Sequence, residues 1–146
     1  MTLPPLILDT GVLVELARGD LDLMEMVARW DEQGQPMVMS VVALAEAARD
    51  SGSKDATDLL LGISTMDQIT VAGLREPEHG IILASVLGRT DLDWGDAHVA
   101  ALADTSVCPV LTLDSSHWTQ AIRAFDEPLH VIQISDPPGD PERDRP

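Results

Sequence analysis

The chain has 146 residues, of which 45% are hydrophobic and 23% are charged, a composition typical of one packed domain rather than of a disordered chain. Its 25 acidic residues face nine basic ones, which gives a formal net charge of -16 and argues against broad nucleic-acid binding through a positive surface. No apolar run approaches the ~20 residues that span a bilayer. The single cysteine, Cys108, cannot form an internal disulfide. We therefore expect a cytoplasmic protein with neither a signal peptide nor a membrane anchor.

Apolar stretches of strand length alternate with stretches of helical periodicity along the chain. In chain order, the sequence predicts strand 6–8, helix 11–18, helix 21–33, strand 38–39, helix 41–49, helix 54–66, strand 69–72, helix 76–88, helix 94–104, strand 110–113, helix 115–125 and strand 131–134. This alternation favours an α/β sandwich of three layers, in which helices flank a mostly parallel central sheet. We expect one domain over residues 1–135. Residues 136–146, rich in proline and charge, are predicted to be a disordered tail.

Two acidic residues directly follow apolar strands. Asp9 comes after the strand at 6–8, and Asp114 comes after the strand at 110–113. Ligands of open parallel sheets lie beyond the carboxyl ends of the strands, so both carboxylates are candidates for a functional site. Each alone could equally be a turn residue or a helix N-cap. The two together favour a site.

A third candidate, Asp96, lies on the side of its helix that should be buried. It shares the stripe formed by Val99, Ala100 and Ala103 at positions i+3, i+4 and i+7. The alternative is a first-turn acid that interacts favourably with the helix dipole. Asp93 precedes the same helix, and we interpret it as the N-cap.

The fourth candidate, Glu46, lies in the middle of the predicted helix 41–49. It lies on the border of an apolar stripe made of Val41, Leu44, Ala45 and Ala48. A glutamate there is ordinarily a solvated edge residue, so it gains weight only beside the other acids. If all four acids converge, their mutual repulsion raises pKa values and destabilises the fold unless a cation is bound. Hard oxygen ligands favour Mg²⁺ or Mn²⁺, and such an ion activates water and neutralises charge during phosphodiester hydrolysis.

These residues, in this order, resemble the PIN domain family, and in particular the small VapC toxin ribonucleases of bacterial toxin–antitoxin pairs. The resemblance rests on four segments, which are 6–13 (LILDTGVL), 40–46 (SVVALAE), 96–103 (DAHVAALA) and 110–114 (VLTLD). It implies a PIN-like, Rossmann-like fold and an endoribonuclease dependent on Mg²⁺ or Mn²⁺. It further implies that Asp9, Glu46 and Asp96 hold the metal and that Asp114 completes the acidic pocket. Two residues are implied to support this pocket by hydrogen bonds: Thr10 and Thr112.

The chain departs from the family pattern after the fourth acid. Family members often have a second acid or a phenylalanine there, whereas this chain continues with Ser115, Ser116, His117 and Trp118. Trp118 can take the place of the aromatic residue. We interpret His117 as an exposed residue at the start of a helix rather than as a general base.

The resemblance also implies partners, namely an RNA substrate, a VapB-like antitoxin and a second copy of the chain in a homodimer. Because the overall charge is strongly negative, RNA has to be held by a few local arginines and the metal. Two alternatives stay open: a PIN-fold module that binds metal or a partner without cleaving anything, and a metal-dependent nuclease with no toxin role. The complete set of four acids favours an enzyme over a binding module.

Overall fold

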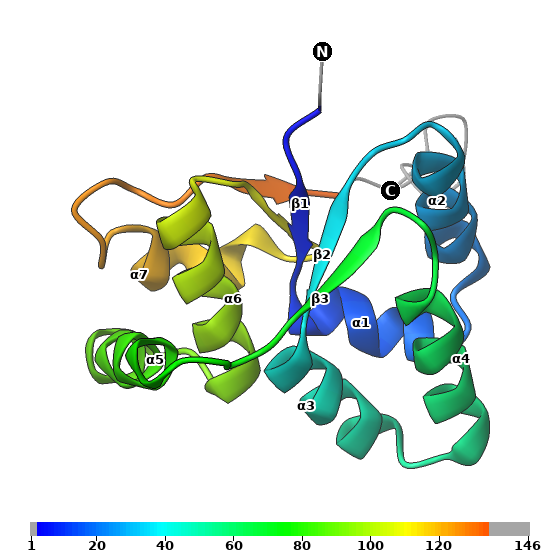
Figure 1. Ribbon diagram of the computed structural model, residues 1–146, viewed down its shortest axis with the longest axis horizontal. Coiled ribbons are helices and arrows are strands. Elements are labelled where there is room, and N and C mark those ends of the chain that lie inside the picture. Colours follow the sequence, from blue (N-terminus) through cyan, green and yellow to red (C-terminus); the bar gives the residue numbers. More distant parts are fainter. Residues whose placement is uncertain (1–2, 135–146) are drawn as a thin grey trace, which may run out of the picture.

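The structure, a computed structural model that describes residues 3–134, is built on a parallel sheet of five strands (Figure 1). The strands are β1 (Leu6–Leu8), β2 (Met37–Ser40), β3 (Ile69–Ala72), β4 (Val110–Thr112) and β5 (Val131–Gln133). They lie in the order β3-β2-β1-β4-β5, and each neighbouring pair is parallel. The chain therefore moves outward from β1 to β3, returns to β4 on the other side of β1, and ends at β5. The topological switch point lies between β1 and β4.

Helices cover both sides of this sheet. They are α1 (Thr10–Ala17), α2 (Leu21–Glu32), α3 (Val41–Ser51), α4 (Lys54–Ser64), α5 (Pro77–Arg89), α6 (Trp94–Ser106), the 3-10 turn η1 (Ser115–Trp118) and α7 (Thr119–Ile122). In Figure 1, α5, α6 and α7 lie to the left of β1, and α2 and α4 lie to its right. Helix α3 contacts α6 of the first group and α4 of the second, as well as α1, so it bridges the two groups. The predicted α/β sandwich with a parallel central sheet is confirmed.

Polar side chains cap the first turns of four helices. A side-chain oxygen of each of four N-cap residues accepts a hydrogen bond from the backbone N–H three residues further on; these N-caps are Asp9, Asp20, Ser40 and Ser53. Helix α3 ends at Gly52, whose φ of 63° places it in the left-handed region that favours glycine. These local signals explain why most predicted boundaries lie within about two residues of the observed ones.

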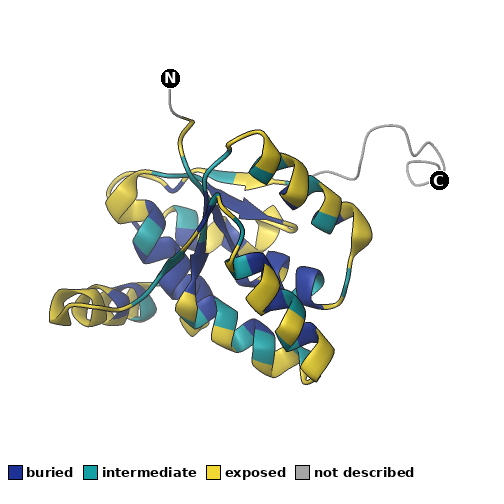
Figure 2. Cartoon of the chain, turned by 45° about the vertical axis from the view of Figure 1, so that its right-hand side comes forward, coloured by how far each residue is buried: buried dark blue, intermediate teal, exposed yellow. Residues whose placement is uncertain are grey.

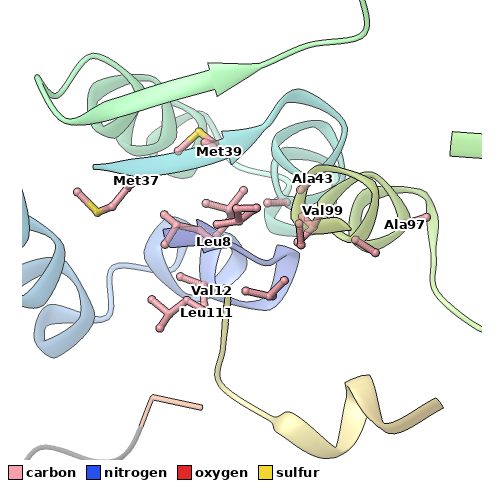
Figure 3. Close-up of a cluster of buried hydrophobic side chains, with 14 of the residues drawn as sticks. Leu8, Val12, Met37, Met39, Ala43, Ala97, Val99 and Leu111 are labelled. Carbon is pink, nitrogen blue, oxygen red and sulfur yellow. The ribbon is translucent and has the colours of Figure 1, made fainter. Parts of the chain in front are cut away.

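The core lies where the central strands meet α1 and α6. Leu8 of β1 is opposite Met39 of β2 and Leu111 of β4, and all three side chains are buried (Figure 3). Figure 2 shows buried residues concentrated on the central strands and exposed ones on the outer helices. Within residues 3–134, every helix is too short or too polar to cross a bilayer.

One predicted element differs from the structure. The single helix expected at 115–125 is instead the 3-10 turn η1 followed by the short α7. The Asp114 side chain accepts from the Ser116 backbone N–H, two residues on rather than three, and so begins a tighter turn. The tail predicted at 136–146 lies outside the described residues.

Helix α6 is buried on almost every side, and it carries His98 into the core. The imidazole is 3% exposed, and its Nδ1 lies 2.7 Å from Oγ of Ser40. Burial, followed by the charge of His79, lowers the pKa of His98 below its ordinary value of 6.5. The native state consequently resists protonation that the unfolded chain accepts.

We therefore predict that the free energy of unfolding falls as the pH drops from about 6.5 through the lowered pKa of His98. Over that interval the unfolded state binds the extra proton, with a slope of at most about 1.4 kcal/mol per pH unit. Urea denaturation at several pH values between 7.5 and 5 measures this change in the free energy of unfolding. In His98→Gln the pH dependence that comes from His98 should be missing. Equal pH dependence in the variant and the wild type would show that His98 is not its source.

Candidate functional site

The four acids singled out by the sequence line one cleft beyond the carboxyl ends of β1 and β4. This cleft has a volume of about 360 Å³, and its walls include Asp9, Glu46, Asp96 and Asp114. Three further acids also line it: Glu15, Asp50 and Asp93. Because β1 and β4 flank the topological switch point, the cleft lies where parallel sheets commonly bind ligands.

Asp9 is the most constrained of these acids. Its Oδ1 accepts a hydrogen bond from the Val12 backbone N–H at 2.9 Å, which begins α1, and its Oδ2 accepts from the Trp118 indole N–H at 3.0 Å. The side chain is 2% exposed. Burial, followed by the negative charge of Asp96, raises the pKa of Asp9, while hydrogen bonds from Thr112, Trp118 and Val12 act in the opposite direction. A nearby cation would relieve both of the effects that raise it.

Asp96 faces Asp9 from the first turn of α6. Its Oδ1 accepts from the Thr10 backbone N–H at 2.9 Å, and its Oδ2 lies 2.9 Å from Nε2 of His117. An ionised carboxylate only accepts hydrogen bonds, so His117 is the donor of this pair. The predicted inward direction of Asp96 is confirmed, since the residue is 6% exposed. Asp96 thus connects α6 to the start of α1 and to η1.

Glu46 reaches the cleft from α3. It is half-buried, and its Oε1 accepts from the Gly95 backbone N–H at 2.9 Å. Gly95 permits this approach, because a Cβ atom there would lie 2.6 Å from Oγ1 of Thr10 and 2.9 Å from Cα of Ala43. The contact links α3 to the first turn of α6 and brings Glu46 beside Asp96.

The apolar stripe on α3 is only partly buried, with Leu44 and Ala48 packed against the core. The buried residues of α3 are Ala43 and Ala47, whereas Val41 and Ala45 are exposed. The face with Ala43 and Ala47 turns inward because small side chains let α3 approach α1 and α6 closely.

Asp114 lines the edge of the cleft and is exposed. Its Oδ1 accepts from both the Oγ hydroxyl (2.6 Å) and the backbone N–H (3.0 Å) of Ser116. The Ser116 hydroxyl, followed by the Ser116 backbone N–H, lowers the pKa of Asp114. This carboxylate therefore stays ionised and caps η1.

The two threonines of the motif behave differently. The Thr10 backbone N–H donates to Asp96, while its Oγ1 atom is buried without a hydrogen-bond partner. The Thr112 hydroxyl lies within hydrogen-bond distance of the Asp114 backbone N–H and C=O, at 3.2 and 3.3 Å. An unpartnered buried hydroxyl beside two carboxylates is a polar atom that a bound ligand or its water can satisfy.

Sequence reasoning undervalued two consecutive residues, His117 and Trp118. Trp118 is completely buried and holds Asp9, whereas His117 keeps 48% of its side chain exposed and holds Asp96. His117 does lie near the start of a helical segment, as expected, but its contact with Asp96 was not predicted. The aromatic position after the fourth acid was the available signal for Trp118.

The predicted capping role of Asp93 needs correction. Asp93 occupies the N-cap position of α6, but its side chain makes no capping hydrogen bond and instead lines the cleft. The neighbouring first-turn acid, Asp96, is turned toward α1. The Asp93 carbonyl accepts from the Ala97 backbone N–H at 2.8 Å, so the residue begins α6 through its backbone while its side chain adds negative charge to the cleft.

The oxygen atoms of the cleft suit a hard, hydrated cation. Within residues 3–134, no three His, Cys, Asp or Glu side chains form a ready-made metal cage. Mg²⁺ does not require one, because it commonly keeps several waters and binds through one or two carboxylates. Asp9 and Asp96 are close enough for the charge of one to raise the pKa of the other, and the Thr10 hydroxyl beside them lacks a partner. The donor set therefore fits such an ion.

Strand order and cleft together define an α/β domain with an acidic site at its topological switch point. A sequence profile of the PIN domain matches residues 6–121, and the chain belongs to the PIN domain family. No curated protein sequence matches it.

Several solved structures share the fold. VapBC2 from Rickettsia felis, solved with a DNA fragment from its promoter, is 13% identical with a TM-score of 0.63, covering 90% of this chain and 99% of that one. VapC20 from Mycobacterium tuberculosis, a toxin that cleaves the sarcin-ricin loop, is 14% identical with a TM-score of 0.56, covering 78% and 93%. FitAcB from Neisseria gonorrhoeae is 19% identical with a TM-score of 0.54, covering 88% and 96%.

Proposed function

We propose that this protein is a VapC-like endoribonuclease that hydrolyses RNA phosphodiester bonds with Mg²⁺ or Mn²⁺. The observation that carries the proposal is the cleft in which Asp9, Glu46, Asp96 and Asp114 meet at the switch point of a PIN-family sheet. Four carboxylates in one cleft repel one another and any phosphate, so their convergence makes chemical sense when a cation binds among them.

The side chains have distinct roles in this proposal. Asp9, Asp96 and Glu46 hold the metal, and Asp114 completes the pocket at its edge. When bound, the ion supplies an activated water and neutralises charge that develops on the phosphate. Trp118 and His117 fix one oxygen of Asp9 and one of Asp96, so both carboxylates are oriented before substrate arrives. Thr10 orients the other oxygen of Asp96 through its backbone N–H.

The direct test is cleavage of a mixed-sequence, end-labelled RNA by the purified chain. We expect cleavage with Mg²⁺ or Mn²⁺ and none after addition of EDTA. A DNA oligonucleotide of the same sequence is the matched substrate, because a nuclease without a toxin role could act on DNA. A folded protein that cleaves neither substrate with either ion would instead favour a binding module.

Metal binding should also be visible without any substrate. We predict that Mg²⁺ or Mn²⁺ at millimolar concentration raises the melting temperature, by the equivalent of about 1.4 kcal/mol at a tenfold excess over Kd. Asp96→Asn should lose most of this shift. Asp114→Asn should keep most of it, because the Asp114 carboxylate already accepts two hydrogen bonds from Ser116. An unchanged melting temperature with both ions in the wild-type chain would count against the metal site.

A small antitoxin is the expected protein partner. The Klebsiella pneumoniae and Salmonella typhimurium relatives of this fold were solved as a toxin–antitoxin complex and as DNA-bound VapBC, respectively. An acidic cleft on a chain of net charge -16 is complementary to an inserted arginine or lysine. Co-expression with the adjacent small gene, followed by size-exclusion chromatography, tests both this partner and the expected homodimer. A monomer that captures no such partner would contradict the toxin role.

A further inference from the structure

A second cavity adjoins the acidic cleft and differs from it in charge. It has a volume of about 570 Å³ and lies over the carboxyl-terminal end of α5, η1 and α7. His117 lines both cavities, so the two are neighbours across one side chain. Ser116, whose hydroxyl donates to Asp114 of the cleft, also lines the second cavity. The second cavity therefore lies beside the acidic cleft, on the other side of the His117 side chain.

Two arginines line the second cavity, although basic residues are scarce in this chain. The whole sequence has nine Lys and Arg residues, and two of them, Arg89 and Arg123, lie on these walls. Neither forms an ion pair with any acid among the described residues, unlike Arg18, Arg49 and Lys54. Both are exposed, so their charges are available to a ligand in solution.

The Arg89 guanidinium is already held in place. It lies over the Phe125 ring, with Cζ 4.5 Å from the ring centroid, and its Nη1 donates to the Ala124 carbonyl at 3.3 Å. Gln120 also fixes the backbone at the end of α5. Its Nε2 donates to the Arg89 carbonyl at 3.0 Å, and its Oε1 accepts from the Asp91 backbone N–H at 3.0 Å. A pre-ordered guanidinium loses less conformational entropy when it binds an anion.

The remaining walls of the second cavity carry little negative charge. The hydroxyls of Ser116 and Thr119 on these walls donate within the protein, to Asp114 and to the Ser116 carbonyl. One acid, Asp91, also lines the cavity, so two guanidinium charges face a single carboxylate. In the neighbouring cleft seven acids line the walls. The second cavity is thus the side of the site on which a polyanion is least repelled.

We propose that Arg89 and Arg123 form a subsite for a backbone phosphate of the RNA substrate, next to the phosphodiester bond that is cut. This subsite rests on the proposed ribonuclease function and deepens it. Guanidinium groups bind phosphate oxygens through paired, charge-assisted hydrogen bonds. Contacts to the backbone position the polymer without reading its sequence. The subsite also explains how a chain of net charge -16 holds RNA beside its acids.

The first test measures binding of a labelled single-stranded RNA in the Asp96→Asn background, with Mg²⁺ present, by fluorescence anisotropy at several salt concentrations. Arg89→Gln/Arg123→Gln should weaken binding about tenfold, because two exposed, solvent-screened guanidinium groups no longer bind the phosphate. The slope of log K against log salt should fall in magnitude by about 0.7, the value expected for one phosphate contact on a single strand. The matched control is Arg29→Gln/Arg75→Gln, which removes the same charge from exposed arginines that line neither cavity.

The second test locates the phosphate. A single neutral methylphosphonate linkage is moved along an RNA that contains a defined cleavage position. When the methylphosphonate replaces one particular linkage beside that position, it should raise the KM of the wild-type chain. In Arg89→Gln/Arg123→Gln, the same modified RNA should have the same KM as the unmodified RNA. The rate at saturating RNA should change little in the arginine variant, because these residues hold the polymer and do not touch the reacting bond.

The outcomes separate the subsite from the proposed function. Equal binding losses in the two double-arginine variants, with wild-type cleavage intact, would overturn the subsite and leave the ribonuclease standing. Loss of antitoxin binding without loss of RNA binding would also overturn it, because the arginines would then serve a protein partner. A wild-type chain that neither binds nor cuts RNA would end both proposals.

Discussion

Replacing Asp96 by asparagine should lower RNA cleavage by roughly 100-fold or more while the fold is retained. The amide oxygen can still accept from the Thr10 backbone N–H, and His117 can accept from the new amide after a change of tautomer. The substitution removes one negative charge from the proposed metal ligands. It also removes a cause of the raised pKa of Asp9, so the metal-free variant should unfold at the same temperature as the wild type or slightly higher. Single-turnover cleavage and thermal unfolding measure the two effects.

The matched control is Asp93→Asn, which removes the same charge from the same cleft three residues earlier. Asp93 accepts no capping hydrogen bond through its side chain, and we place it outside the metal ligands. Cleavage should stay within a few-fold of the wild-type rate. Equal losses in the two variants would show either that both acids bind the metal or that Asp93 is the functional one.

Replacing Gly95 by alanine should lower both stability and activity. The added methyl group would lie 2.9 Å from Cα of Ala43, a backbone atom that cannot move without shifting α3 away from α6. Overpacking of this kind lowers the free energy of unfolding by about 1–3 kcal/mol. Because the same movement lengthens the Gly95 hydrogen bond to Glu46 and displaces Asp96, cleavage should fall as well. Denaturant unfolding and the cleavage assay report the two consequences.

Gly80→Ala is the matched control and should not lower stability or activity. Gly80 lies in α5, and a Cβ atom there meets nothing within 4 Å. Alanine is favoured over glycine inside a helix by roughly 0.5–1 kcal/mol, so this variant should be slightly more stable and equally active. If Gly95→Ala behaved like Gly80→Ala, the close contact of α3 and α6 would not matter to the site.

The fold could be read from the sequence because its signals are local. Short apolar strands, polar N-caps such as Ser40 and the helix-ending Gly52 each act within a few residues. The buried face of α3 could not be read in this way. That helix has alanine or valine on more than one side, so periodicity alone does not decide which side faces α1 and α6. Tertiary packing decides it.

The site was predictable in its acids but not in the groups that hold them. Asp9 follows a buried strand, and Asp96 lies on a buried stripe, so each is conspicuous in the sequence. The contacts of His117 and Trp118 depend on where η1 folds back over the sheet, which no local pattern encodes. Gly95 was missed for a similar reason, since its importance comes from Ala43, which lies about fifty residues away.

The position of Trp118 has a consequence for how the protein is made. Asp9 is synthesised early and its indole donor 109 residues later, while η1 is itself fastened to β5 through the hydrogen bonds from Ser115 to Oε1 of Gln133. Contacts of such sequence separation form only after nearly the whole chain is available. A nascent chain on the ribosome, or a fragment cut before η1, lacks the indole and imidazole that hold the second oxygen of Asp9 and of Asp96. The proposed ribonuclease would thus have its complete site only when translation is almost finished.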